Sequence, residues 1–299
     1  MTADEAVPRA PLLMRGWLWA LDYAYAGRRQ LAILAAPWTI GRPRRAPVPW
    51  RTGSDDLAEI VLLPGVYEHW TFLRPLGNAL NAAGHRVSVV HGLGTNRRGI
   101  VETSERLGRV LTDTPPPKAG RVLVAHSKGG LIGKHLLVSS GAAAAAAVEA
   151  ATGGSAADAA AGATATMDDG VTAAGASIAG SDTEDPGTAP PSAGAPLGLL
   201  GLVAICTPFR GSTLAGMFFV PSIRAFLPDD ETIVMLGREA SVNGRIVSIF
   251  GRFDPHIPGG SALDGATNVI VPASGHFRVL GSRETHAAVL DGVRLLSAR

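Results

Sequence analysis

The sequence predicts an α/β fold built on a doubly wound, mostly parallel sheet with helices on both faces. From Leu57 onward, short runs rich in Val, Ile and Leu alternate with helical stretches, and these runs are apolar at successive positions. Strands buried on both faces have this continuous pattern, and ligands then bind at the carboxyl ends of the strands. With 299 residues, 46% of them hydrophobic and 17% charged, the chain is long enough for one such domain with insertions.

The first expected element precedes the sheet. Leu12–Ala36 is apolar and aromatic, but Arg15, Asp22 and two arginines interrupt it, so it is too polar for a membrane-spanning helix. We expect an amphipathic helix that packs on the body, with peripheral contact of a membrane surface as the alternative. Gly41–Arg51, rich in Pro and Arg, predicts a solvated linker, and no set of interleaved aromatic residues favours nucleic-acid binding.

Six strands and four helices follow in the expected domain. The predicted strands are Ala58–Leu63, Arg86–Val90, Arg121–Ala125, Leu202–Cys206, Arg245–Phe250 and Asn268–Val271. The predicted helices are Trp70–Ala82, Val101–Leu111, Gly129–Val138 and Arg283–Leu296.

One segment does not fit this alternation. Ser140–Leu197 consists almost wholly of Ala, Gly, Ser, Thr, Asp and Pro, and has no aromatic residue. The alanine run Ala142–Ala147 can extend the preceding helix by a turn or two, but beyond it too little apolar surface exists to offset the ordering entropy. We therefore expect an N-terminal helix and linker at 1–56 and a domain at 57–299 with a disordered insertion at 141–197.

The chain contains one cysteine, Cys206, within an apolar run. A single cysteine excludes an internal disulfide and predicts a buried structural thiol. Nothing in the cysteine content indicates an oxidising compartment, so we expect a cytoplasmic protein, with membrane association through the N-terminal helix as the alternative.

The segment Ala125–Gly129 joins a predicted strand to a predicted helix through a serine. This sharp turn admits only small residues two positions before and after the serine, and Ala125 and Gly129 meet that requirement. It presents the hydroxyl at the end of the strand, with a helix N-terminus behind developing negative charge. The pattern predicts that Ser127 is a nucleophile; a serine in an ordinary turn is the alternative.

A nucleophilic serine needs a histidine to take its proton and a carboxylate to orient that histidine. In such a scaffold the acid and then the histidine follow the serine along the chain, each just past a strand. Asp254 lies just past the fifth predicted strand, and His276 follows the sixth through a loop of small residues. The alternatives are Asp264, in a turn, and His286, inside the last helix.

The tetrahedral intermediate of acyl transfer also needs hydrogen-bond donors for its oxyanion. The backbone N–H of Lys128, directly after Ser127, is the first expected donor. The loop Leu63–Tyr67 after the first strand supplies the second, where Gly65 lets the chain turn. We expect the N–H of Val66, with Tyr67 next and an ordinary Pro-Gly turn as the alternative.

The sequence does not predict a metal ion or a cofactor. The remaining histidines have no partners at metal-ligand spacing. Gly92 and Gly94 follow a strand, but the next glycine, Gly99, comes too late for a dinucleotide fingerprint, and no phosphate-binding GK[S/T] loop occurs.

Taken together, these residues resemble the α/β-hydrolase lipases and esterases, especially compact bacterial lipases. The resemblance covers about Leu57 to Leu296 without the insertion. Its motifs are Leu63–Gly65, His126–Gly130, Thr207–Ser212 and Leu263–His276. Many relatives carry a histidine where this chain has Pro64, and another where it has Phe209.

The resemblance implies a serine carboxylic-ester hydrolase that acts through an acyl-enzyme on a small-molecule or lipid ester. It implies the roles of nucleophile, orienting acid and general base for Ser127, Asp254 and His276, and of oxyanion donors for Val66 and Lys128. Such enzymes often carry a cap after the fourth strand, and the apolar stretch there contains Phe218 and Phe219. We expect this stretch to line an acyl pocket, with core packing as the alternative for any one of its residues. Phe218, Phe219 and, from the loop after the first strand, Tyr67 are expected to contact the substrate.

Two further functions remain open from the sequence. An acyltransferase or thioesterase would use the same three residues, so the sequence does not separate it from an esterase. A catalytically silent protein of the same fold could act as a binding or membrane-associated module through its N-terminal helix.

Overall fold

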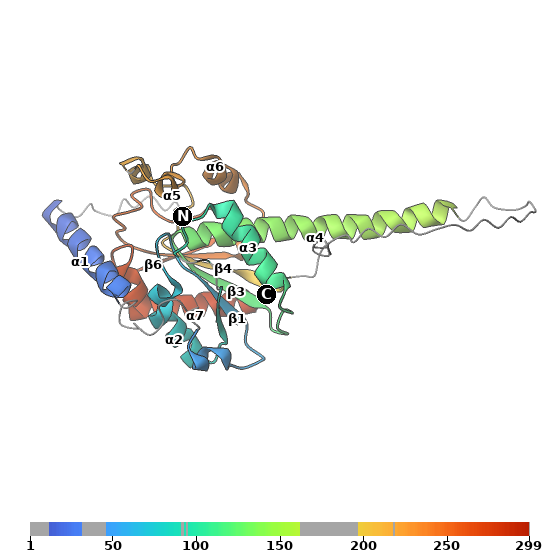
Figure 1. Ribbon diagram of the computed structural model, residues 1–299, viewed down its shortest axis with the longest axis horizontal. Coiled ribbons are helices and arrows are strands. Elements are labelled where there is room, and N and C mark those ends of the chain that lie inside the picture. The colour runs from blue at the N-terminus through green and yellow to red at the C-terminus, as the bar shows by residue number, and fades with distance from the viewer. Residues whose placement is uncertain are drawn as a thin grey trace, which may run out of the picture. The chain divides into compact units, whose positions relative to one another are not determined.

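A computed structural model describes residues 12–31, 46–90, 93, 95–161, 197–217 and 219–298. It contains a six-stranded sheet in the order β2-β1-β3-β4-β5-β6, with every neighbouring pair parallel (Figure 1). The strands are β1 (Glu59–Leu63), β2 (Val87–Val89), β3 (Arg121–His126), β4 (Leu199–Ile205), β5 (Ile246–Gly251) and β6 (Thr267–Val271). The predicted doubly wound α/β sheet is confirmed, and every predicted strand is present within a few residues of its expected bounds.

The central strands are buried on both faces, which explains their continuous apolar runs. In β1, Ile60 and Leu62 belong to one buried cluster, whereas Val61 and Leu63 belong to another. The first cluster also holds residues of α2 (Arg74–Ala82) and α7 (Arg283–Ser297), and the second holds residues of α3 (Ile100–Thr112) and α4 (Lys128–Ala161). Helices therefore cover both faces of the sheet, as Figure 1 shows.

Shorter helices connect these elements. Their bounds are α5 (Pro221–Arg224) and α6 (Glu231–Arg238), and for the 3-10 helices η2 (Val48–Arg51), η3 (Trp70–Leu73), η4 (Thr213–Met217), η5 (Asn243–Arg245) and η6 (Arg278–Gly281).

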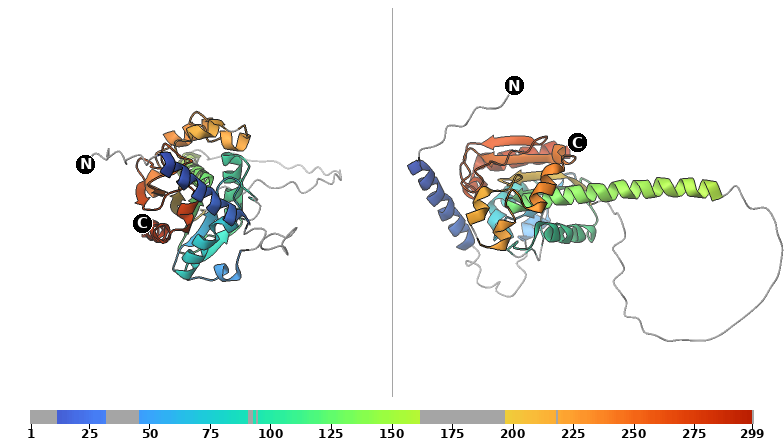
Figure 2. Two further views of the ribbon diagram at one scale, coloured as in Figure 1. Left: turned by 90° about the vertical axis from the view of Figure 1, so that its left-hand side faces the viewer. Right: turned by 90° about the horizontal axis from the view of Figure 1, so that it is seen from above.

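The N-terminal helix α1 (Leu12–Leu31) packs on the body, as the favoured prediction has it. It lies beside the segments that follow β1 and β6 (Figure 2), where Arg29 donates to the carbonyl oxygen of Thr71 at 2.8 Å. In the part of the chain that the structure describes, no helix has the length and apolar character needed to cross a bilayer. Peripheral membrane contact through α1 stays a prediction.

The predicted solvated linker is wrong at its C-terminal end. Residues 32–45 lie outside the described residues, but Val48–Arg51 forms the 3-10 helix η2. Trp50 is 1% exposed within it and packs edge-on against Trp70, with its indole N–H donating to Asn78 at 2.9 Å. Burial of this aromatic ring makes η2 part of the core, because a large apolar side chain gains free energy when it leaves water.

The chain divides into two units, residues 1–139 with 196–299 and residues 140–195. The expectation that the alanine run extends the preceding helix by only a turn or two is wrong, since α4 continues to Ala161. Alanine has the highest helix propensity, so an alanine-rich stretch can continue a helix without tertiary contacts at each turn. The rest of the predicted disordered insertion, residues 162–196, lies outside the described residues.

Candidate active site

The turn between β3 and α4 holds Ser127 in a left-handed backbone conformation. Its φ is +50°, a region that residues other than glycine rarely adopt. The backbone N–H of Ser127 donates to the carbonyl oxygen of Ile205 at 2.9 Å, and its own carbonyl accepts from the hydroxyl of Thr207 at 3.0 Å. A Cβ at Gly129 would collide with the carbonyl oxygen of Leu63, which explains why the turn needs glycine there.

Two loops bring the predicted histidine and acid to this serine. His276 follows β6, and its Nε2 lies 3.0 Å from the Ser127 hydroxyl oxygen. Asp254 follows β5, and its Oδ2 lies 2.8 Å from Nδ1 of His276. All three side chains are at least nine-tenths buried and stand at the carboxyl ends of their strands. We call this arrangement the Ser–His–Asp array.

The charges of the array shift the pKa of both titratable partners. Burial alone would lower the pKa of His276, but the charge and hydrogen bond of Asp254, with the charges of Glu68 and Asp22, together outweigh burial, so the pKa lies above its usual value. Burial alone would raise the pKa of Asp254, but the charge and hydrogen bond of His276 bring it below its usual value. Asp254 also accepts hydrogen bonds from the backbone N–H groups of His256 and Ile257 at 2.8 and 3.2 Å. The acid is therefore held as a carboxylate and oriented.

The structure places both rival residues outside the array. The side chain of Asp264 is 92% exposed and pairs with Arg210 at 2.9 Å. The imidazole of His286 lies on α7 and contacts the carbonyl oxygen of Leu280 at 2.9 Å. Neither residue is available to orient or replace His276.

Cys206 is buried, as the sequence predicts, and lies against the array. Its sulfur and one ligand atom each of Asp254 and His276 fall within 4.8 Å of one another, and no other such group occurs among the described residues. Burial raises the pKa of the Cys206 thiol well above its usual value, and the nearby Asp254 adds to the shift. A protonated thiol beside a carboxylate and an imidazole that already bond each other does not suit a metal ion.

The loop after β1 is fixed by a buried carboxylate. Glu68 is 3% exposed and accepts from the backbone N–H of Gly65 at 2.8 Å, so this N–H is already bound. The next residue, Val66, is half-buried and the first in the loop whose N–H is not bound by Glu68. Asn96 donates to the carbonyl oxygen of Pro64 at 2.6 Å and further anchors the loop.

Lys128 begins α4 directly after Ser127. Its backbone N–H is therefore one of the first N–H groups of the helix, which have no hydrogen-bond acceptor within the helix itself. Its side chain is buried and donates to the carbonyl oxygens of Asn96 (2.9 Å) and Arg98. Burial lowers the pKa of the Lys128 ammonium group to about 8. The side chain therefore ties α4 to the segment after β2 rather than facing a ligand.

The residues predicted to contact substrate differ in their positions. Tyr67 has a φ of +60°, and its hydroxyl lies 2.8 Å from that of Ser222, so it joins the loop after β1 to α5. Phe218 lies outside the described residues. Phe219 is 94% exposed, so it is not a core residue, and its contact with the substrate stays a prediction. It stands between η4 and α5 in a segment without regular secondary structure, and its ring is exposed to solvent. Phe226, from the same apolar stretch, is a core residue at 7% exposure.

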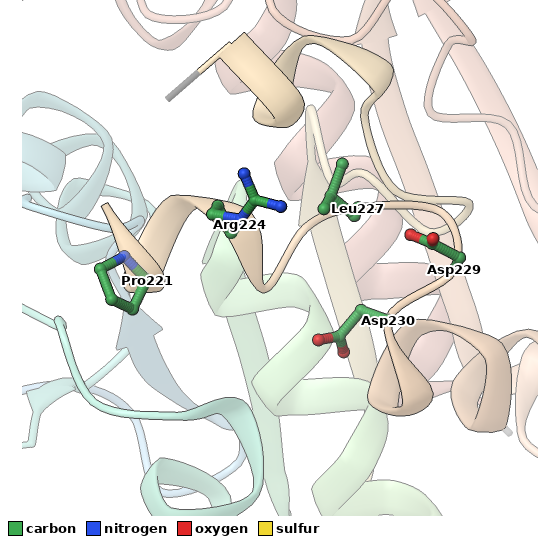
Figure 3. Close-up of a pocket in the computed structure, with 5 residues that line it drawn as sticks. All are labelled: Pro221, Arg224, Leu227, Asp229 and Asp230. Atoms are coloured by element: carbon green, nitrogen blue, oxygen red, sulfur yellow. The ribbon is translucent and has the colours of Figure 1, made fainter. Parts of the chain in front are cut away.

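A cavity of about 460 Å³ lies beside α5 and the start of α6 (Figure 3). Of the residues that the structure describes, those that line it are Pro221, Arg224, Leu227, Asp229 and Asp230. Asp230 also caps α6 by accepting from the N–H of Thr232 at 3.0 Å. No residue of the Ser–His–Asp array lines this cavity.

Sequence reasoning missed two acids at the site, Asp22 and Glu68. Glu68 bonds Nδ1 of His126 at 2.8 Å, and Nε2 of His126 lies 3.0 Å from the carbonyl oxygen of His276. His126 is thus fully buried between Glu68 and the loop of His276. Asp22 accepts from the backbone of the His276 loop. Its only signal in the sequence is an isolated acid within an apolar helix.

No protein-family model and no curated protein sequence matches this chain. Solved structures do. A lipase of Bacillus licheniformis, BlEst2 in its mature form, is 11% identical, with a TM-score of 0.51 over 84% of this chain and 96% of that one. Its propeptide form is 11% identical, with a TM-score of 0.50 over 87% of this chain and 53% of that one. A metagenomic carboxyl esterase, MGS0156, is 13% identical, with a TM-score of 0.49 over 86% of this chain and 81% of that one.

At such low identity these comparisons concern the fold alone. The parallel six-stranded sheet and the serine turn between β3 and α4 agree with the likeness to mature BlEst2 over nearly that lipase's whole length. The chain has the α/β-hydrolase fold.

Proposed function

We propose that this chain is a serine carboxylic-ester hydrolase that acts through an acyl-enzyme on Ser127. One observation carries the proposal: the hydroxyl of Ser127 lies 3.0 Å from an imidazole whose other nitrogen lies 2.8 Å from a buried carboxylate. The strained φ of Ser127 supports it, because backbone strain of this kind is concentrated at functional sites.

In the first step Nε2 of His276 takes the hydroxyl proton while the Ser127 oxygen attacks the ester carbonyl carbon. Asp254 accepts a hydrogen bond from Nδ1–H, which keeps Nε2 free as the base and stabilises the imidazolium that forms. His276 then gives its proton to the leaving alcohol as the C–O bond breaks. Water repeats the sequence on the acyl-enzyme, with His276 again as base, and releases the acid.

The carbonyl oxygen becomes negatively charged in both tetrahedral intermediates. We assign its stabilisation to the backbone N–H groups of Val66 and Lys128, each worth about 3 kcal/mol of barrier in comparable enzymes. Glu68 supports this assignment because it occupies the N–H of Gly65 and fixes the loop before Val66. The positive N-terminal end of α4 lies behind the same oxygen.

The substrate class that we propose is a small-molecule or lipid ester. Tyr67 follows Val66 directly and links the loop after β1 to α5, so we place it beside the bound ester. Phe219 could contact only the distal part of a long acyl chain, since its ring stands in solvent.

Covalent labelling tests the proposal. A fluorophosphonate probe should form an adduct on Ser127, located by mass spectrometry of peptides, and the protein should hydrolyse p-nitrophenyl esters in a chain-length series. Ser127→Ala should lose the label, keep its folding transition and lower kcat by about 10⁴ to 10⁶. Folded protein that takes no label and hydrolyses no ester would refute the proposal and leave a catalytically silent module. Faster turnover with an alcohol or thiol acceptor, or on thioesters, would instead assign the array to acyl transfer or thioester hydrolysis.

A further inference from the structure

The N-terminal helix α1 carries one acidic residue, Asp22, and this residue is fully buried. Its Oδ2 accepts from the backbone N–H of His276 at 3.0 Å. Its Oδ1 accepts from the backbone N–H groups of Phe277 at 2.9 Å and Arg278 at 2.8 Å. A buried carboxylate is costly unless hydrogen bonds replace its hydration, and three charge-assisted bonds do so here. The side chain of Asp22 thus binds three successive residues that begin at the histidine of the array.

The same loop is held from its other side. The carbonyl oxygen of His276 lies 3.0 Å from Nε2 of His126, a buried imidazole. Gly275, just before the histidine, has a φ of +108°, and a Cβ there would collide with Oδ1 of Asp22. The backbone of His276 is therefore held through its N–H by Asp22 and through its C=O by His126, while its side chain bonds Ser127 and Asp254.

Aromatic contacts of α1 cover this carboxylate. Trp19 stacks on His256 with ring centroids 5.2 Å apart, and Tyr23 meets the same imidazole edge-on at 5.3 Å. Nε2 of His256 lies 3.7 Å from Oδ2 of Asp22, but burial, together with the charge of His276, lowers the pKa of His256 to about 4. His256 is therefore neutral at pH 7, and the backbone N–H groups are the partners that hold Asp22.

We propose that Asp22 is a positioning residue, which fixes the loop of His276 so that its Nε2 stays within hydrogen-bond distance of the Ser127 hydroxyl. The proposal rests on the proposed ester hydrolysis, and it makes α1 a part of the active site rather than an appendage. Asp22 touches neither the substrate nor the reacting atoms, so its effect passes through His276. A displacement of about 1 Å at a reacting group can cost on the order of 10²-fold in rate.

Asp22→Asn is the most direct test, because it keeps the volume of the side chain. An amide nitrogen cannot accept, so at least one of the three N–H groups loses its partner. For p-nitrophenyl butyrate we expect kcat to fall by roughly 10²-fold with KM unchanged, since the substrate contacts are intact. Backbone amide exchange at residues 276–278 should become faster, a readout that needs no turnover.

Tyr25→Ala is the matched control on the same helix. Tyr25 packs on the core and contacts Phe72 edge-on at a centroid distance of 6.5 Å, without bonding the loop of His276. It should lower the thermal midpoint as Asp22→Asn does, yet leave kcat and the exchange of residues 276–278 unchanged. Should Asp22→Asn not fold, Gly275→Ala disturbs the same contact from the loop side, and the same drop in kcat with unchanged KM is expected.

Unchanged kcat and exchange in a folded Asp22→Asn protein would overturn the proposal. An equal loss of kcat in Tyr25→Ala would also overturn it, because general loosening of α1 would then suffice. Wild-type protein that hydrolyses no ester would refute the proposed function instead. The exchange comparison would still decide whether Asp22 holds the loop.

Discussion

Replacement of Asp254 by Asn should prevent His276 from acting as the general base, although the new side chain has the same shape. Oδ1 of Asp254 accepts from the N–H groups of His256 and Ile257, so the amide oxygen of asparagine must stay there. The amide NH₂ then takes the place of Oδ2, 2.8 Å from Nδ1 of His276. Because NH₂ only donates, Nδ1 must accept, and the single proton of the neutral imidazole moves to Nε2. That nitrogen then donates toward Ser127 and cannot take its proton.

The expected loss is large because the wrong tautomer blocks the proton transfer itself. The corresponding substitution in a serine protease lowers kcat by about 10⁴-fold, which is about 5.5 kcal/mol of transition-state free energy. The binding contacts of the ester do not involve the acid, so KM should change little. Two backbone N–H groups keep their acceptor, and the free energy of unfolding should therefore fall only modestly.

The assay compares kcat and KM for p-nitrophenyl butyrate between wild type, Asp254→Asn and Asp264→Asn. Asp264 is the matched control, because it is the rival acid and its side chain is 92% exposed. The Asp264→Asn variant should retain the kcat and KM of the wild type. A loss of less than tenfold in Asp254→Asn, or an equal loss in Asp264→Asn, would refute the assignment of the orienting acid.

Three further predictions use other parts of the chain. The raised pKa of His276 predicts that kcat/KM falls as the pH drops through a midpoint above 6.5, because the protonated imidazole is no base; a pH–rate profile with a midpoint at or below 6.5 would contradict this. Trp50→Ala should lower the free energy of unfolding in urea by about 3–5 kcal/mol while kcat of the folded protein is retained, and a loss within error would place the ring outside the core. Phe219→Ala should reduce kcat/KM for long acyl esters more than for acetyl esters; equal reduction on both would count against a contact with the acyl chain.

The sheet and the Ser–His–Asp array could be predicted because their determinants are local. Two-sided burial gives each strand a continuous apolar run, and the parallel order brings Asp254 and His276 to the same sheet edge as Ser127. Trp50 could also have been assigned to the core, since one large aromatic residue within a Pro- and Arg-rich stretch calls for burial. The continuation of α4 through the alanine run agrees with the high helix propensity of alanine.

The contacts of Asp22 could not be predicted in the same way. Its partners are backbone N–H groups more than 250 positions away, and every residue except proline carries such a group. No pattern of side chains therefore marks the pairing. The exposure of Phe219 could not be predicted from the sequence either, because an apolar stretch has the same composition whether its side chains face the core or the solvent.

Glu68 offers the opposite outcome to Asp254 for the same kind of substitution. Nε2 of His126 faces the carbonyl oxygen of His276, so it must carry a proton, and Nδ1 faces Glu68. In Glu68→Gln the amide oxygen can accept from Gly65 N–H while its NH₂ donates to an unprotonated Nδ1, which is the tautomer that the carbonyl already requires. All partners stay satisfied, and kcat should be retained. Glu68→Ala leaves two buried polar groups unpaired at a cost of about 1–3 kcal/mol each, so it should lower both the free energy of unfolding and kcat. Equal damage by Gln and Ala would mean that residue 68 must carry a negative charge. The group that Nε2 faces, a carbonyl oxygen for His126 and a hydroxyl for His276, would then not explain why the two substitutions differ.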